Sequence, residues 1–339
     1  MTLVADPNAQ AHEVRAPIAE LGVYQLLERV GAGALGEVFR ARDTVHGRTV
    51  AIKRVPSGLV ADDAWCSALH DTAASLAAVS HPGVAMLYEC GQSDGQMFLA
   101  QEFVPGQSLT KLLGGRPINA RRAVDLAIEA ADALAALHAA GHTHGDLRPD
   151  NIVVTQKGHV KLLDAGLARF TGGGAVHLTA SARLGSLPDE ALPVVRYLAP
   201  EQALGEGGDR RSDLFSLGLV LYEMLTGQPA FDRTGADETL LAIVRASVQA
   251  PSTRQASVPA GLDAVVARAL AKPVDRRYQT ASAFADDLRA AKSALEVGLE
   301  QAPLPGPAKA EGRSKLLWWV LALAAAGGAI TWSVLRSAS

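Results

Sequence analysis

The segment from Tyr24 to Val55 places a glycine cluster between stretches in which apolar and polar residues alternate. Alternation with a period of two is typical of half-buried β-strands, and TVHG supplies a turn before the last stretch, so the segment predicts three antiparallel strands. Gly31, Gly33 and Gly36 have the spacing GxGxxG, which dinucleotide-binding folds share. A dinucleotide site needs a helix at the third glycine, whereas EVFRAR continues as a strand. We therefore expect a hairpin whose backbone N–H groups cover phosphates.

Lys53 ends the third predicted strand, in the sequence VAIK. A lysine on a half-buried pleated surface needs an anionic partner, and a phosphate under the glycine loop is the natural candidate. Taken alone, the glycines are also compatible with a plain hairpin turn, and Lys53 with a solvated position. Their spacing along neighbouring strands favours a phosphate site.

A second group of polar residues lies in HGDLRPDN, after a helix predicted by the three-to-four-residue period of INARRAVDLAIEAADALAALHAAG. Asp146 is suited to accept a proton or orient a hydroxyl nucleophile, Arg148 to neutralise a transferring phosphoryl group, and Asn151 to bind a metal ion. The next stretch predicts a hairpin that ends at Asp164. Oxygen ligands from Asn151 and Asp164 suit Mg²⁺. The alternative is that these residues only form turns in three loops.

Five motifs in order make the sequence resemble a family, the eukaryotic-like (Hanks-type) Ser/Thr protein kinases of bacteria, from about Val23 to Ala291. GAGALGEV is similar to their glycine-rich loop, VAIK to the ATP-anchoring strand, and HGDLRPDN to the catalytic loop. LLDAGLAR resembles the magnesium-binding segment, and YLAPEQ the end of the activation segment. The resemblance implies an α+β, two-lobed fold: a small antiparallel sheet plus one helix, then a larger, mainly helical lobe. It also implies ATP as donor, Mg²⁺, and Ser/Thr hydroxyls of protein substrates as acceptors.

The same resemblance assigns an adenine site. LAQEFVPG is similar to the link between the lobes, so the backbone of Glu102 and Val104 would bond the adenine edge, with Gln101 at the gatekeeper position. A purine needs flat apolar contacts, which would come from Val38, Ala51 and Val153. The resemblance further pairs Glu201 with Arg277 in a structural role.

Gly145 introduces an alternative, because HGDxxxxN is also the catalytic loop of small-molecule phosphotransferases of the aminoglycoside and choline kinase type. Those enzymes resemble protein kinases in the N-lobe and catalytic loop, but they do not carry the APE segment or the SDLFSLG helix that occur here. A protein substrate is therefore favoured. Gly145 replaces an arginine that in many relatives pairs with a phosphorylated activation loop, so activity should not depend on that pairing.

Three supporting positions depart from the family pattern. The helix glutamate that would pair with the strand lysine falls at Thr72, next to Asp71. Ala165 stands where a phenylalanine packs beneath that helix, and Val194 where a threonine touches the catalytic aspartate. Two hypotheses follow, a working kinase and a pseudokinase that binds nucleotide or partners without turnover. The working kinase is favoured because the groups expected to touch ATP, metal or nucleophile are all present: Lys53, Asp146, Asn151 and Asp164.

The composition of the chain limits the classes of partner and of structural site that can be expected. The chain of 339 residues is 48% hydrophobic and 20% charged with a formal net charge of -3, which argues against a nucleic-acid partner. Its two cysteines, Cys66 and Cys90, have no CxxC spacing, which argues against a disulfide framework and a zinc site.

The C-terminal part predicts a membrane anchor. Residues 316–335, LLWWVLALAAAGGAITWSVL, carry no charge, and about 20 residues at about 1.5 Å each can cross about 30 Å of hydrocarbon. A buried core helix is the alternative. Arg313 and Lys315 precede the span and Arg336 alone follows it, which favours a single-pass protein of the cell membrane with the kinase domain in the cytoplasm. The run AAAGGA is compatible with a homodimer within the bilayer.

The predicted domain order follows from these segments. It comprises a flexible leader at 1–21, an N-lobe at 22–104, a C-lobe at 105–292, a linker rich in Pro, Gly and Ala at 293–315, the transmembrane helix at 316–335 and a short tail at 336–339.

Overall fold

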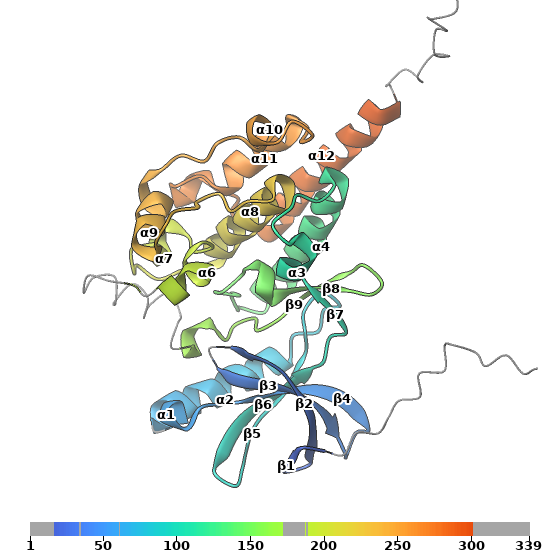
Figure 1. Ribbon diagram of the computed structural model, residues 1–339, viewed down its shortest axis with the longest axis vertical. Helices are drawn as coiled ribbons and strands as arrows, with labels where there is room; N and C mark the ends of the chain where they lie inside the picture. Colours follow the sequence, from blue (N-terminus) through green and yellow to red (C-terminus); the bar gives the residue numbers. More distant parts are fainter. Residues whose placement is uncertain (1–16, 34, 61, 172–186, 188, 301–339) are drawn as a thin grey trace, which may run out of the picture. The chain divides into compact units, whose positions relative to one another are not determined.

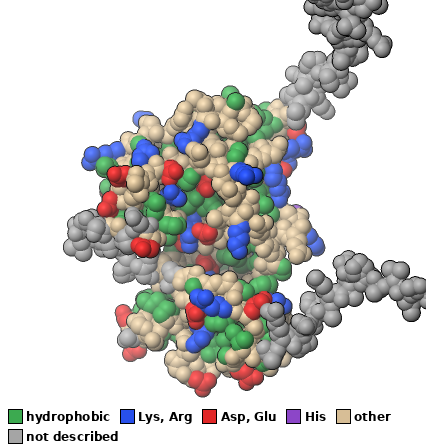
Figure 2. All heavy atoms as spheres, in the orientation of Figure 1, with side chains coloured by type: hydrophobic (Ala, Val, Ile, Leu, Met, Phe, Trp, Pro, Cys, Tyr) green, Lys and Arg blue, Asp and Glu red, His purple; other side chains and the backbone are tan. Residues whose placement is uncertain are grey.

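A computed structural model describes residues 17–33, 35–60, 62–171, 187 and 189–300 of the chain. The described residues up to Leu295 belong to one compact unit, and a second unit begins at Glu296. The compact unit has a sheet-rich N-lobe, drawn at the bottom of Figure 1, and a mainly helical C-lobe above it. Basic and acidic side chains are intermingled over both lobes on the face that Figure 2 presents.

The N-lobe is built on a six-stranded antiparallel sheet with the order β1-β2-β3-β4-β6-β5. Its strands are β1 (Ala19–Leu21), β2 (Tyr24–Gly33), β3 (Gly36–Asp43), β4 (Arg48–Arg54), β5 (Leu87–Ser93) and β6 (Gln96–Glu102). β2, β3 and β4 are the three antiparallel strands that the sequence predicts. The third glycine, Gly36, opens strand β3 rather than a helix, so the dinucleotide-binding fold is excluded.

Helix α2 (Asp63–Ala77) is the long helix of the N-lobe, and a short α1 (Ser57–Val60) precedes it. The Asp62 carboxylate caps α2 by accepting the backbone N–H groups at its start. The buried residues of α2 share one face, which packs against β5 and joins the large hydrophobic core of the unit: Leu69, Thr72, Ala73 and Leu76. The opposite side of the sheet has its own small core, which includes Tyr24, Phe39, Ile52 and Phe98.

The C-lobe is organised around α8 (Arg210–Thr226), which is buried along almost its whole length. Its apolar residues lie on all sides, as expected of a helix that is enclosed by others. α4 (Ala120–Ala139) and α11 (Gly261–Ala269) pack against it. The other helices are α3 (Leu109–Leu113), α6 (Leu192–Val195), α7 (Pro200–Ala203), α9 (Ala236–Arg245), α10 (Pro251–Arg254) and α12 (Ala281–Glu300), with short 3₁₀ turns η1 (Pro149–Asn151), η2 (Ala168–Phe170), η3 (Asp189–Ala191) and η4 (Val274–Arg276).

A small three-stranded sheet belongs to the C-lobe and holds two predicted site residues at its strand ends. Its order is β7 (Gly106–Ser108), β8 (Ile152–Thr155), β9 (Val160–Leu162), with antiparallel pairs. β8 begins immediately after Asn151, and β9 ends just before Asp164. The hairpin expected between these two residues is confirmed.

Two expected boundaries differ from the structure. β1 lies inside the range 1–21 that the sequence assigned to a leader, because Ala19–Leu21 pairs with the start of β2. α12 continues to Glu300, past residue 293, where the linker was expected to begin. The rest of that linker, the span at 316–335 and the tail at 336–339 lie outside the described residues. Within the described ranges, no helix is both long enough and apolar enough to cross a membrane.

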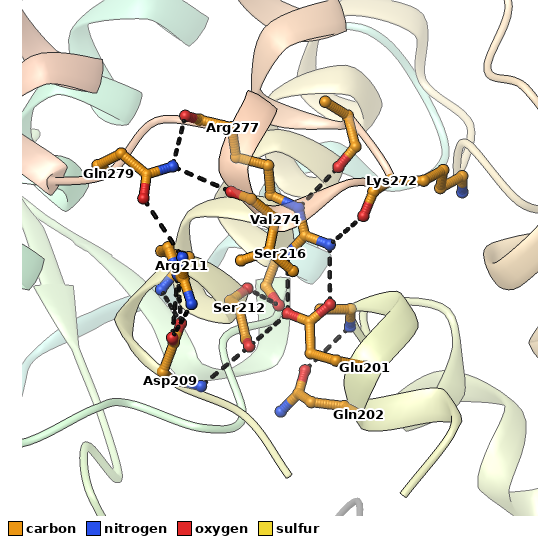
Figure 3. A network of polar contacts seen from close by, with 12 residues as sticks. Glu201, Gln202, Asp209, Arg211, Ser212, Ser216, Lys272, Val274, Arg277 and Gln279 are labelled. Atoms are coloured by element: carbon orange, nitrogen blue, oxygen red, sulfur yellow. Dashed lines mark hydrogen bonds and ion pairs between the residues drawn. The ribbon is translucent and has the colours of Figure 1, made fainter. Parts of the chain in front are cut away.

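A buried ion pair ties α7 to Arg277, the residue that follows η4 (Figure 3). Arg277 Nη1 and Nη2 donate to Glu201 Oε1 and Oε2 at 2.7 and 2.8 Å, and the Arg277 side chain is fully buried. Arg277 also donates to the carbonyl oxygens of Ala271 and Lys272, while Ser212 Oγ donates to Glu201 at 2.6 Å. Burial acts to raise the pKa of Glu201, but the hydrogen bonds from Arg277 and Ser212 lower it below its ordinary value. The predicted pairing of Glu201 with Arg277 is confirmed.

We predict that Glu201→Ala lowers the free energy of unfolding by about 3–5 kcal/mol, because Arg277 would stay buried without its counter-ion. Urea unfolding at neutral pH measures the change. The folded-state pKa of Glu201 is lowered, so the pair stabilises the fold above the unfolded-state pKa, and this contribution is lost as the pH falls through the folded-state pKa. The difference between wild type and variant should therefore shrink on acidification.

Glu206→Ala is the matched control for that measurement, since Glu206 is exposed. Its effect should stay within about 0.5 kcal/mol. Equal losses at the two positions would contradict the importance of the buried pair.

Candidate active site

A cleft of about 540 Å³ contains nearly all the residues that the sequence singled out. Its lining comes from the β2–β3 hairpin, from β4, from the segment that follows β6, and from the loops before β8 and after β9. The predicted residues that line it are Gly31, Gly33, Gly36, Val38, Ala51, Lys53, Gln101, Glu102, Val104, Asp146, Arg148, Asn151 and Asp164. Val153 is not among the lining residues; it is buried in β8, where Gly106 packs against it. Leu35, Phe103 and Leu167 line the cleft and were not predicted.

The glycine hairpin forms one wall of this cleft. Gly33 and Gly36 are register partners at the point where β2 turns into β3. Gly36 has a φ of +103°, and a Cβ on it would lie 2.0 Å from the carbonyl oxygen of Arg54, so this position requires glycine. A Cβ on Gly31 or Gly33 would meet no atom within 4 Å. The hairpin therefore keeps open space beside its backbone, as a phosphate-covering loop needs.

Lys53 and Asp164 form an ion pair in the cleft, which joins β4 to the segment after β9. Gln101 Nε2 donates to the same oxygen, Asp164 Oδ1, at 3.5 Å. Asp164 has a φ of +60°, an uncommon conformation for a residue other than glycine. Burial acts to raise the pKa of Asp164, but the Lys53 charge and hydrogen bond outweigh it and hold the pKa below its ordinary value. Asp164 is therefore ionised near neutral pH and suited to a cation.

The loop before β8 holds Asp146 in a fixed orientation. Asn151 Nδ2 donates to the carbonyl oxygen of Asp146 at 2.8 Å and to its Oδ2 at 3.0 Å. Arg148 Nε lies 3.3 Å from both carboxylate oxygens, and Arg148 Nη1 donates to Asp150 at 2.6 Å. Burial raises the pKa of Asp146 above its ordinary value, although the charges of Arg148 and His144 partly oppose this. Asp146 thus has the more basic carboxylate of the two, as a proton acceptor requires.

Asp213 is a positioning residue that sequence reasoning missed. Its Oδ2 and Oδ1 accept the backbone N–H groups of His144 and Gly145, each at 2.8 Å, and the His138 ring lies 2.8 Å from Oδ2. The carboxylate is buried inside α8, so it needs such partners. A signal was available in SDLFSLG, where a single acid lies in an apolar run, but the run alone does not say which backbone groups it bonds.

The backbone conformation of the loop before β8 favours glycine at position 145. It has a φ of +80°, and a Cβ there would lie 2.8 Å from the Cβ of Ala168. Its carbonyl oxygen accepts a hydrogen bond from Gln202 Nε2 at 3.2 Å. Glycine therefore fits this conformation without strain, and the fixed loop does not depend on a side chain at this position.

The segment at the back of the cleft offers the polar edge expected for adenine only in part. The Glu102 N–H already donates to the carbonyl oxygen of Met86 at 2.8 Å, so Glu102 can offer a ligand only its carbonyl group. The Glu102 side chain accepts from Lys161 Nζ at 2.6 Å. Glu102 and Val104 both line the cleft, with Phe103 between them.

The departures from the family pattern have visible consequences. Among the described residues, no hydrogen bond joins Thr72 to Lys53; the Thr72 hydroxyl accepts from Arg169 Nη2 instead. Lys53 is paired with Asp164 rather than with a residue of α2. Ala165 and Val194 are both partly buried and pack against the large core.

The donor set fits a hard cation and a nucleotide. Asn151 uses its amide nitrogen toward Asp146, which leaves Oδ1 as the atom able to bind a metal ion, and Asp164 supplies an ionised carboxylate. Two oxygen donors beside a phosphate suit Mg²⁺, which keeps several waters and substrate phosphates as ligands. Among the residues that the structure describes, no cluster of three or more His, Cys, Asp or Glu side chains could hold a metal by itself.

Comparisons with known proteins agree with this geometry. Residues 24–288 match the family described as protein kinase domain. A probable serine/threonine-protein kinase of Streptomyces coelicolor is 34% identical over 282 residues, which cover 82% of this chain and 41% of that protein. The serine/threonine-protein kinase PknB of Mycolicibacterium smegmatis is 37% identical over 270 residues, 78% of this chain and 42% of that protein. The chain thus spans about two fifths of the length of these relatives.

The fold has a solved counterpart in the PknI kinase domain of Mycobacterium tuberculosis. The two superpose with a TM-score of 0.62 at 23% sequence identity, over 80% of this chain and 98% of that one.

Proposed function

The chain belongs to the protein kinase family, and we propose that it acts as a serine/threonine protein kinase that transfers the γ-phosphoryl group of ATP to Ser/Thr hydroxyls of protein substrates. One observation carries the proposal. The cleft holds an oriented Asp146, whose carboxyl group has a raised pKa, together with an ionised Asp164 that is paired with Lys53. These groups provide a proton acceptor, a cation ligand and a phosphate-binding cation, which phosphoryl transfer requires.

Each side chain has a defined part in this proposal. Asp146 would orient the acceptor hydroxyl and take its proton, while Arg148 would offset the charge that develops on the transferring group. Lys53 would exchange its contact with Asp164 for the ATP phosphates. Asp164 and Asn151 would hold Mg²⁺, which when bound neutralises phosphate charge. Most of the reduction in barrier would then come from positioning and electrostatics.

Two alternatives are weighed against this function. A pseudokinase is favoured by one observation, namely that Thr72 stands where a glutamate was expected to orient Lys53 and bonds Arg169 instead. A small-molecule phosphotransferase is disfavoured, because the Glu201–Arg277 pair and the Asp213 contacts belong to the segments that those enzymes do not carry.

We predict that Asp146→Asn abolishes phosphate incorporation, because asparagine cannot accept the hydroxyl proton. Incorporation of the label from γ-³²P-ATP with Mg²⁺ into the chain and into a general protein acceptor measures activity, and a parallel titration measures ATP binding. ATP binding should change little, since the phosphates are held by other groups. If wild type and variant bind ATP and incorporate equally little label, the pseudokinase alternative holds instead.

We predict that Arg148→Gln moves the acid limb of the pH–rate profile to higher pH. Asp146 acts in its ionised form, so activity is present above its pKa and falls as the pH drops through it. The Arg148 charge lowers that pKa, and its removal must raise it further. Arg116→Gln, at an exposed position, is the control and should leave the limb unmoved. A limb that stays in place, or moves to lower pH, argues against Asp146 as the titrating group.

We also propose that residues 316–335 anchor the chain in the cell membrane with the kinase domain in the cytoplasm, on the strength of their uncharged length and the basic residues before them. The full chain should stay in the membrane pellet after a carbonate wash, whereas a chain that ends at Ala310 should be released. Release of both would refute the anchor.

A further inference from the structure

Two polar side chains of helix α2, Thr72 and Ser75, contact the C-lobe. Among the residues that the structure describes, no hydrogen bond or ion pair joins the side chains of α2 to β4. The Thr72 hydroxyl donates to the carbonyl oxygen of Ala68 at 2.7 Å and accepts from Arg169 Nη2. Thr72 is 7% exposed, so the arginine reaches a hydroxyl that is otherwise enclosed. Arg169 belongs to η2, which follows the metal-binding segment. The pair therefore connects α2 to the start of the activation segment.

Two further contacts also connect α2 to the C-lobe. The Trp65 and Phe170 rings meet edge to face with centroids 5.7 Å apart, and the Arg169 guanidinium lies 4.7 Å from the centroid of the same Phe170 ring. Near the end of α2, Ser75 Oγ lies 2.7 Å from His142 Nε2, in the loop that carries Asp146. Along its length, α2 is thus held by η2 and by the catalytic loop.

The position of α2 is transmitted to Asp164 through Leu76. A Cβ on Gly166 would lie 2.9 Å from Leu76 Cδ2, so the leucine side chain packs directly on the Gly166 backbone. Gly166 N–H donates to the carbonyl oxygen of His144 at 3.3 Å. Any displacement of α2 therefore acts on the backbone next to Asp164. Ala165 offers only a methyl group at the neighbouring position, so Leu76 provides a large side chain of α2 that supports this backbone.

We propose that Arg169 is a positioning residue: it orients α2 through the Thr72 hydroxyl, and α2 in turn supports Asp164 through Leu76. Lys53 pairs with Asp164 and not with α2, so it can exchange that contact for the phosphates without releasing α2. The inference rests on the proposed phosphotransferase function for its catalytic consequence, but the contact itself can be tested without catalysis.

The first test is amide hydrogen exchange of the full chain in detergent, followed by mass spectrometry. Arg169→Gln should speed exchange in α2 by about three- to thirtyfold, as expected when one charge-assisted hydrogen bond is lost. Arg169→Lys keeps one donor and should fall between wild type and the glutamine variant. Arg245→Gln, at an exposed position near the end of α9, is the matched control and should not change α2. Unchanged exchange in Arg169→Gln would overturn the proposal.

A second readout follows α2 directly through Trp65. With Trp318, Trp319 and Trp332 changed to Phe, Trp65 is the sole tryptophan of the full chain. Its emission should shift to longer wavelength in Arg169→Gln as the ring leaves Phe170 and gains water. Thermal unfolding of each variant shows whether the fold persists; if Arg169→Gln unfolds, the comparison of Arg169→Lys with wild type takes its place.

The decisive test is a double-mutant cycle with Thr72→Glu. A glutamate at 72 should pair with Arg169, slow exchange in α2 and raise kcat by about two- to fivefold. Both gains should vanish in the Arg169→Gln background. If they persist there and the exchange protection instead vanishes with Lys53→Met, α2 is oriented by Lys53 and the proposal is wrong.

Kinetics separate positioning from a merely structural role. Arg169→Gln should lower kcat by about three- to tenfold while the Kd for ATP changes less than about twofold, because Asp164 is displaced whereas the glycine hairpin and the segment from Glu102 to Val104 keep their places in the cleft. A fall in kcat accompanied by an equally large weakening of ATP binding would overturn the proposal. If no variant, wild type included, incorporates phosphate but exchange in α2 follows Arg169, the proposed kinase function fails while the positioning contact stands.

Discussion

The carboxylate of Asp213 determines where the chemistry of this protein takes place. It lies inside α8, the most enclosed helix of the C-lobe, and accepts the backbone N–H groups of His144 and Gly145 at 2.8 Å each. A buried carboxylate without such partners would be costly, and a loop without such an acceptor would leave buried N–H groups unpaired. The N–H groups of His144 and Gly145 satisfy the carboxylate, and the carboxylate satisfies those N–H groups. The loop that carries Asp146 is therefore as fixed as the core helix on which it rests.

The surroundings of two aspartates in the cleft shift their pKa values in opposite directions. Burial raises the pKa of Asp146, whereas the Lys53 charge lowers that of Asp164 despite its burial. Pairs of carboxyl groups whose environments push their pKa values apart divide the roles of base and charge carrier. Here one carboxylate is suited to take a proton and the other to hold a cation, and the two lie on loops at either end of the β8–β9 hairpin.

The departures from the family pattern are linked rather than independent. With Thr72 in place of the helix glutamate, α2 loses its expected tie to Lys53, and with Ala165 it loses a large side chain beneath it. In the structure, η2 provides both substitutes: Arg169 bonds Thr72, and Phe170 meets the Trp65 ring. Helix α2 is therefore held by the segment after Asp164 instead of by Lys53 of β4. For this reason we regard α2 as positioned from the C-lobe.

Local patterns in the chain were sufficient to predict several strands and the main residues of the cleft. The alternation around Gly31 to Gly36 predicted three strands, and HGDLRPDN with the following hairpin predicted Asp146, Asn151 and Asp164 as neighbours; the structure brings all of them into one cleft. Tertiary structure alone decided that Asp213 holds the loop, that Arg169 takes Thr72 and that Val153 stays outside the cleft lining. The physical reason is separation along the chain: Asp213 and His144 are 69 residues apart and Arg169 and Thr72 97. No periodicity or motif spacing within this chain reaches that far. A comparably distant pair, Glu201 with Arg277, was expected only through the family resemblance; the other contacts appear only when the packed core sets the relative positions of its helices and loops.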